Sequence, residues 1–319
     1  MNPNDLAERI ISGDEKAASR AISMIENGEE TGFEVLSKLY PKTGTSFRIG
    51  VTGSPGAGKS TIIDRLAFCY GKKGKKIGVI AIDPTSIKTK GAFFGDRLRL
   101  KNAEKIEGIF IRSMAHRGFS GGISKAALGA ECILEALGKE IIIVESVGVG
   151  QTELSISLIS DVVITVLTPD FGDEIQLMKA GLLDIGDIIV MNKMDIPNAE
   201  EKAKDIIHYL ESIKGEISVP LVKTIARQGQ GVELLIDTLE QEREKKLKEE
   251  KENKEKIKTL VIALIKEEME KGIEEMMEKN ITFNDLLAQV ISKKLDPYYM
   301  ARLVVSNILK NGKLEETLG

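Results

Sequence analysis

The chain contains 319 residues with a formal net charge of -4 and only two cysteines, which allows one large core with appended elements and provides no disulfide framework. Its mixed charges create no basic field for nucleic acid, no apolar run reaches the ~20 residues that span a bilayer, and the first residues lack the basic start of a secretion signal. We therefore expect a cytoplasmic protein without nucleic acid or membrane partners.

Residues 3 to 40 have the apolar spacing of short helices. Leu6, Ile10 and Ile11 share one face of the first helix, and Asp14 precedes the second helix in the position of an N-cap. Nothing in this segment suggests catalysis. We predict that residues 1–43 form a helical extension packed on the domain that follows, residues 44–236.

A glycine-rich loop follows the first apolar run after this extension. A strand, a glycine loop and a helix in this order are what a phosphate-binding loop requires, because backbone N–H groups and the helix N-terminus attract phosphate oxygens. We expect Lys59 to contact the β- and γ-phosphates of a nucleoside triphosphate and Ser60 to bind Mg²⁺. The complete loop consists of Gly53, Ser54, Pro55, Gly56, Ala57, Gly58, Lys59, Ser60 and Thr61.

Strand-like apolar runs alternate with helical stretches from Ser46 onward. This alternation predicts an α/β fold, a P-loop NTPase with a mostly parallel sheet covered by helices on both faces. Ligands of such sheets bind at the carboxyl ends of the strands, so polar residues there are the functional candidates. The seven predicted strands are Phe47 to Thr52, Ile77 to Asp83, Ile109 to Arg112, Ile141 to Glu145, Val162 to Leu167, Ile188 to Asn192 and Val219 to Thr224.

Charged residues follow the second and third strands. Asp83 ends the second strand, where a carboxylate either organises Mg²⁺ and the attacking water or caps the next turn. The long polar connection after it contains Asp96, which we predict to be a further acid on the metal side. Arg112 and Arg117 either stabilise charge on the transferred phosphoryl group or form ordinary salt bridges, and we interpret His116 as a loop histidine.

The fourth strand ends at Glu145. In phosphate-loop proteins an acid at this position holds Mg²⁺, and the N–H of a following glycine, here Gly148, senses the γ-phosphate. This arrangement predicts a switch that responds to the nucleotide state. Gln151 is a candidate for orienting the attacking water, and it lies further from that glycine than the corresponding glutamine of small signalling GTPases.

Asn192, Lys193 and Asp195 end the sixth strand and predict a guanine site. The Asp195 carboxylate accepts hydrogen bonds from both N1–H and the 2-amino group of guanine, an arrangement of donors that adenine lacks. We predict that Ala226, after the last strand, provides a backbone contact to guanine O6. The expected ligand is therefore GTP or GDP, and no tightly bound organic cofactor is expected.

A long helical stretch without Pro or Gly is predicted from Val232 to Lys271. Its first half is densely charged, and its second half has an apolar stripe at helical spacing. We interpret residues 237–319 as a helical arm that leaves the domain and docks on another subunit; the alternative is a helix that folds back on its own core. Two further helices, broken near Pro297, are predicted. The apolar stripe consists of Ile257, Val261, Leu264, Ile265, Met269 and Ile273.

Together these motifs resemble the MeaB/ArgK family, GTPase chaperones of cobalamin-dependent methylmalonyl-CoA mutase and related acyl-CoA mutases. The resemblance covers nearly the whole chain. The glutamate that opens the Glu145 motif is its most diagnostic element, because common phosphate-loop GTPases have Asp there. The matching motifs are Gly50 to Thr61, Asp83 to Ser86, Gly95 to Arg97, Arg112 to Gly118, Glu145 to Glu153 and Asn192 to Asp195.

The resemblance implies a homodimeric GTPase with a C-terminal dimerisation arm. Such a protein gates the delivery of adenosylcobalamin to its mutase and protects or reactivates it, and an adenosyltransferase is a further candidate partner. By motif position, the resemblance assigns Mg²⁺-side roles to Ser60, Asp83, Asp96 and Glu145. It also implies a third switch that couples nucleotide state to the mutase, where local sequence alone favours a capped helix start; its residues are Asp170, Asp173, Glu174 and Lys179.

Two other functions share parts of this pattern. A kinase, an activity attached to this family in amino-acid transport, would place phosphate on an acceptor and use ATP, which Asp195 argues against. A nickel-insertion GTPase shares the glutamate and aspartate arrangement but needs a site rich in histidine or cysteine. The chain has only two residues of each type, so the sequence favours the mutase chaperone.

Overall fold

The computed structural model describes residues 2–84, 100–116, 125–146, 152–170, 186–214, 219–248, 250–279 and 281–311. The chain divides into two compact units, Met1–Val261 and Ile262–Gly319, and each is described by itself. Several predicted site residues lie outside the described ranges, so their roles stay predictions. These residues are Asp96, Arg117, Gly148, Gln151, Asp173, Glu174 and Lys179.

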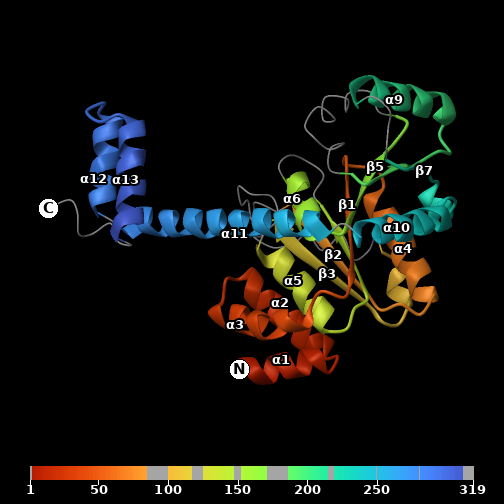
Figure 1. The fold of residues 1–319 in the computed structure, drawn as a ribbon, viewed down its shortest axis with the longest axis horizontal. Coiled ribbons are helices and arrows are strands. Elements are labelled where there is room, and N and C mark those ends of the chain that lie inside the picture. Colours follow the sequence, from red (N-terminus) through yellow and green to blue (C-terminus); the bar gives the residue numbers. More distant parts are fainter. Residues whose placement is uncertain are drawn as a thin grey trace. The chain divides into compact units, whose positions relative to one another are not determined.

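A sheet of seven strands forms the centre of the described part of the first unit (Figure 1). All its pairings are parallel, and the strand order is β3-β2-β4-β1-β5-β6-β7. This confirms the predicted α/β fold. The strands are β1 Phe47–Gly53, β2 Ile77–Pro84, β3 Ile109–His116, β4 Ile141–Glu145, β5 Val162–Leu167, β6 Ile188–Met191 and β7 Leu221–Lys223.

Helices surround this sheet. They are joined by short 3-10 helices at Tyr40–Lys42 (η1), Ala103–Lys105 (η3) and Ala226–Gln228 (η5). Within the described ranges, no helix combines the length and the apolar character needed to cross a membrane. The helices of this unit are α1 Pro3–Ile11, α2 Glu15–Glu26, α3 Glu30–Leu39, α4 Lys59–Lys72, α5 Lys125–Ala136, α6 Thr152–Ile159, α9 Ala199–Lys214, α10 Val232–Lys246 and the first part of α11 Glu250–Lys279.

Successive residues of a strand point to opposite faces, and each face has its own helical layer. In β4, Ile141 and Ile143 join the core formed with α4 and α10, whereas Ile142 and Val144 join the core formed with α5 and the N-terminal helices. Strands covered in this way are apolar on both sides, which explains their near-continuous runs of Val and Ile. These strand runs therefore predicted both the sheet and its double cover.

The N-terminal helices α1 to α3 pack against α5 in one of these cores. The side chain of Asp14 accepts hydrogen bonds from the backbone N–H groups of Lys16 and Ala17, at 2.9 and 3.0 Å, which confirms the predicted N-cap. Arg112 of β3 pairs with Glu26 of α2. Of its two predicted roles, Arg112 therefore has the salt-bridge role.

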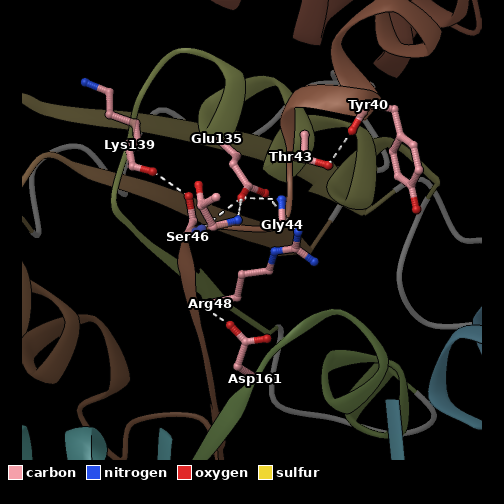
Figure 2. A network of polar contacts seen from close by, with 9 residues as sticks. Tyr40, Thr43, Gly44, Ser46, Arg48, Glu135, Lys139 and Asp161 are labelled. Atoms are coloured by element: carbon pink, nitrogen blue, oxygen red, sulfur yellow. Dashed lines mark hydrogen bonds and ion pairs between the residues drawn. The ribbon is translucent and has the colours of Figure 1, made fainter. Parts of the chain in front are cut away.

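A buried carboxylate fixes the segment that joins these helices to β1 (Figure 2). The Oε1 atom of Glu135 accepts hydrogen bonds from three consecutive backbone N–H groups, those of Gly44, Thr45 and Ser46. Its Oε2 atom lies 2.9 Å from a guanidinium nitrogen of Arg48. Burial raises the pKa of Glu135, but the Ser46 amide, the guanidinium of Arg48 and the Thr45 amide outweigh it and hold the pKa below its ordinary value.

The C-terminal part of the first unit differs from the predicted continuous helical stretch, which is wrong in this respect. Helix α10 ends at Lys246 and α11 begins at Glu250. The residues around the break are attached to the amino edge of the sheet: the Lys246 ammonium pairs with Asp187 at 2.7 Å, and Lys256 donates to the carbonyl oxygen of Ser160. The chain contains no Pro or Gly between these two attachments.

The second unit contains the end of α11 and two helices, α12 Ile281–Ile291 and α13 Pro297–Asn311. Asp296 accepts a hydrogen bond from the N–H of Tyr299 at 2.9 Å and so caps α13. The predicted break near Pro297 is confirmed. The small core of this unit consists of Phe283, Met300 and Val304, with Leu286, Val290 and Leu295 packed against it.

We expect Glu135→Gln to lower the free energy of unfolding at neutral pH by about 1–3 kcal/mol, because it weakens several charge-assisted hydrogen bonds of a buried group. Since the folded-state pKa of Glu135 is depressed, its stabilisation is full above the ordinary pKa of 4.5 and is lost as the pH falls through the lower folded value. The difference between variant and wild type should therefore shrink in acid.

Urea unfolding between pH 3 and 7 measures this effect. Glu34→Gln, at an exposed position of α3, is the control. A difference for Glu135→Gln that stays constant across this pH range would contradict the assignment.

Candidate nucleotide-binding site

The carboxyl ends of the parallel strands meet at one edge of the sheet, and the predicted site residues that the structure describes lie there. The register places Val51 of β1 opposite Glu145 of β4, and Gly53 opposite Val166 of β5. Met191, the last residue of β6, is opposite Lys223, the last residue of β7. The loops that follow these strands therefore leave the sheet side by side.

The glycine-rich loop has a backbone that few other residues adopt. Gly53, Gly56 and Gly58 have φ angles of 135°, 78° and 97°, in the region that favours glycine. A Cβ atom at Gly58 would overlap the side-chain nitrogen of Asn192. The glycine motif is thus required both for the turn and for the approach of a second loop.

Lys59, the first residue of α4, extends its side chain back across this loop. Its Nζ atom donates to the carbonyl oxygens of Gly53 at 2.7 Å and Ser54 at 3.1 Å, and the residue is 7% exposed. Positive charge, loop amides and the N-terminus of α4 therefore come together. This combination attracts anions with several oxygens, such as linked phosphates.

Two of the predicted Mg²⁺ residues contact each other. The hydroxyl of Ser60 donates to Oε1 of Glu145 at 3.0 Å. Ala81 of β2 is in register with Glu145, so Asp83 lies further along β2 toward the same edge. Hydroxyl and carboxylate oxygens are the ligands that Mg²⁺ prefers, so the donor set fits this ion.

Asn192 connects the glycine loop to the segment after β7. Its Nδ2 atom donates to the carbonyl oxygen of Ala57 at 2.9 Å. Its Oδ1 atom accepts from the hydroxyl of Thr224 at 3.0 Å and from the N–H of Ala226 at 3.1 Å. The residue is only 3% exposed, so these bonds form in a site protected from water.

The residues after Asn192 form a tight turn toward the surface. Lys193 has a φ angle of 61°, and the N–H of Met194 donates to the carbonyl oxygen of Thr224 at 3.2 Å. Lys193 and Asp195 are both exposed. The structure thus brings Lys193, Asp195 and Ala226 to the same edge as the glycine loop.

The predicted third switch is described only at its start. Asp170 pairs with Lys202 of α9 at 2.5 Å, and both side chains are exposed. Exposed pairs contribute little stability. This contact therefore does not decide between a switch and a capped helix start.

Sequence reasoning assigned only backbone contacts to the segment after β7 and missed the hydroxyl of Thr224. That group donates to Asn192 because β6 and β7 are neighbours. A hydroxyl residue directly after the last strand is the signal that could have identified it.

Comparisons with known proteins agree with this geometry. The sequence profile of the family described as "Methylmalonyl Co-A mutase-associated GTPase MeaB" matches residues 18–279. A protein of Pyrococcus abyssi with a provisional GTPase name is 40% identical over 97% of this chain and 98% of its own length. GTPase ArgK of Escherichia coli is 35% identical over 62% of each chain. A solved LAO/AO transport system kinase has a similar fold, with a TM-score of 0.70 and 22% identity over 97% of this chain and 98% of its own.

We expect Gly58→Ala to weaken nucleotide binding by more than about tenfold, because the added methyl group displaces the Asn192 amide and disturbs several hydrogen bonds. Titration of a fluorescent nucleotide measures the dissociation constant. The matched control is Gly74→Ala, since Gly74 also has a positive φ, 81°, but a Cβ there meets nothing within 4 Å. Equal affinities of the two variants would refute the proposed contact.

Proposed function

The chain belongs to the MeaB family of methylmalonyl-CoA mutase-associated GTPases, and from this premise we propose that it is a chaperone of a cobalamin-dependent acyl-CoA mutase in the cytoplasm. GTP hydrolysis is the activity of the family. In this proposal, hydrolysis gates the loading of adenosylcobalamin and drives the protection or reactivation of the mutase. The family description supports the client, and an adenosyltransferase is a second candidate partner.

The observation that most supports a GTP site is the buried amide of Asn192. It joins the proposed phosphate loop at Ala57 to the proposed base loop at Ala226. In our assignment Asp195 accepts hydrogen bonds from N1–H and the 2-amino group of guanine, and the N–H of Ala226 is shared with O6. These groups discriminate against adenine because adenine offers neither an N1–H nor a 2-amino donor to the Asp195 carboxylate.

For hydrolysis, we assign the stabilisation of charge on the γ-phosphate to Lys59 and the loop N–H groups. Ser60 and Glu145 would hold Mg²⁺, together with Asp83 and Asp96 on the same side. When bound, Mg²⁺ neutralises charge on the β- and γ-phosphates. Gln151 and Asp83 are our candidates for orienting the attacking water, and Gly148 is our candidate for sensing the γ-phosphate.

We also propose that the protein acts as a homodimer. Four residues of the apolar stripe of α11, Ile257, Val261, Ile265 and Met269, are each between 42% and 52% exposed. Contiguous exposed apolar side chains of this kind mark interaction surfaces. A second copy of the chain provides a matching stripe, and two-fold pairing is the commonest symmetry of such assemblies.

The client is tested by free phosphate release from GTP, with ATP as the control nucleotide, in the presence and absence of a mutase loaded with adenosylcobalamin. We expect the mutase to increase GTP turnover and to leave ATP turnover near background. Lys59→Ala should reduce both basal and stimulated turnover by roughly a hundredfold, the size of effect expected when a charge-stabilising group is removed.

The other outcomes of this experiment are distinct. If no mutase changed the rate of GTP turnover, the assignment of GTPase activity would stand and the proposed client would be refuted. Phosphate found on an acceptor instead of in solution would support a kinase, the activity for which the solved relative is named.

Base selection gives a separate prediction. Asp195→Asn should weaken GTP binding by about a hundredfold and strengthen xanthosine triphosphate binding, because the new amide N–H repels the 2-amino donor of guanine but pairs with the 2-oxo group of xanthine. Competition against a fluorescent guanine nucleotide measures both affinities. Asp195→Ala is the control. It should lower the affinity for GTP without raising the affinity for xanthosine triphosphate. An unchanged ratio of the two affinities in Asp195→Asn would contradict the assignment.

A further inference from the structure

Arg65, in the second turn of α4, contacts the segment that the proposed function assigns to the base. Its Nε atom donates to the carbonyl oxygen of Ala226 at 3.0 Å, and its Nη2 atom donates to the carbonyl oxygen of Arg227 at 2.6 Å. The two acceptors are consecutive in the chain. The planar guanidinium therefore binds η5 with a two-pronged geometry that a lysine could not reproduce.

The segment held in this way is short, and its Ala226 is buried in the core formed with α4 and α10. Its internal bonds are single backbone contacts, from Gln228 N–H to Ile225 O at 2.9 Å and from Gly229 N–H to Ala226 O at 3.0 Å. Ile225 also pairs with Gln230 across the loop. These bonds join residues only a few positions apart, so they fix the shape of the turn, whereas contacts with other elements fix its position relative to the phosphate loop.

Both backbone polar groups of Ala226 are hydrogen-bonded to side chains of other elements. Its N–H donates to the Oδ1 atom of Asn192 at 3.1 Å, and its carbonyl oxygen accepts from Arg65. Asn192 is bonded in turn to Ala57 of the phosphate loop, and that loop continues directly into α4, which carries Arg65. The phosphate loop, α4 and the base loop are therefore linked in a ring of contacts: Arg65 joins α4 to the base loop, and Asn192 joins the base loop to the phosphate loop.

We propose that Arg65 is a positioning residue for guanine recognition: it fixes the peptide of Ala226 relative to the phosphate loop, so that its N–H is held where O6 of guanine lies when the phosphates are bound. The inference rests on the proposed assignment of Ala226 to the base. Arg65 acts through that peptide and does not itself contact the nucleotide. It therefore contributes to affinity for the base, and the chemical step proceeds without it.

Arg65→Met tests this role, because it keeps a long side chain and removes both donors. The probes are GTP and 6-thio-GTP, whose sulfur accepts hydrogen bonds more weakly than O6. We expect the substitution to lower the affinity for GTP by about tenfold and the affinity for 6-thio-GTP by less than about threefold. The reason is that 6-thio-GTP gains little from a hydrogen bond with the Ala226 N–H. At saturating GTP, kcat should be unchanged while KM rises.

Two controls isolate the effect. Lys73→Met removes an exposed ion pair with Glu233, which also joins the end of α4 to α10, and should leave both affinities unchanged. Arg65→Lys keeps the charge and loses the two-pronged geometry, so it should show a smaller loss than Arg65→Met with the same preference for GTP. It also provides a measurement if Arg65→Met does not fold.

The outcomes separate this inference from the assignment on which it rests. If Arg65→Met lowered the affinities for GTP and 6-thio-GTP equally, or lowered kcat, Arg65 would have a general structural role and the proposal would be overturned. If the wild-type protein bound the two nucleotides equally, the O6 contact itself would be absent and the base assignment would fail first. Neither result depends on the mutase, because all measurements use the protein alone.

Discussion

The buried side chain of Asn192 is the contact on which the nucleotide site depends. It follows β6, and the strand order places β5 between β6 and β1, so the amide has to cross the end of β5 to reach the phosphate loop. Gly58 permits this approach because it has no Cβ. Each buried donor or acceptor left without a partner costs about 1–3 kcal/mol, so neither loop can move from its place without a penalty at the other.

The two edges of the sheet carry different kinds of contact. The carboxyl edge holds the phosphate and base loops. The amino edge holds ion pairs and carboxylates that fix the chain segments next to the strands. Glu135 binds the linker to β1, and Asp187, just before β6, pairs with Lys246 at the end of α10. Glu135 can therefore be varied without changing any residue proposed for the nucleotide site.

The sequence was most informative where a pattern is local. The seven strands were predictable because parallel strands covered on both faces have continuous apolar runs, and Asp14 and Pro297 were predictable because caps and breaks act on adjacent residues. The glycine loop and the Asn192 motif could be proposed for the nucleotide site because phosphate and guanine require particular residue types at fixed spacing, and their nucleotide contacts stay predictions.

Features that depend on tertiary contacts were not predictable in the same way. The break between α10 and α11 has no Pro or Gly and lies between attachments to Asp187 and Ser160, which are remote in sequence. The grip of Arg65 on η5 gave no signal either, because an arginine on a helix surface is usually solvated and its acceptors here are backbone carbonyls that any sequence provides. Sequence patterns thus indicated the residues that we propose for the nucleotide site, but not the contacts that hold them in position.

The position of Asn192 between the two loops has a thermodynamic consequence. Asn192 bonds to both loops at once, so a ligand fragment that displaces either loop also disturbs the contacts of the other. The binding free energies of a phosphate fragment and a base fragment therefore should not sum to that of the whole molecule. If our assignment of the two loops is right, the guanine and phosphate parts of a nucleotide bind cooperatively rather than independently.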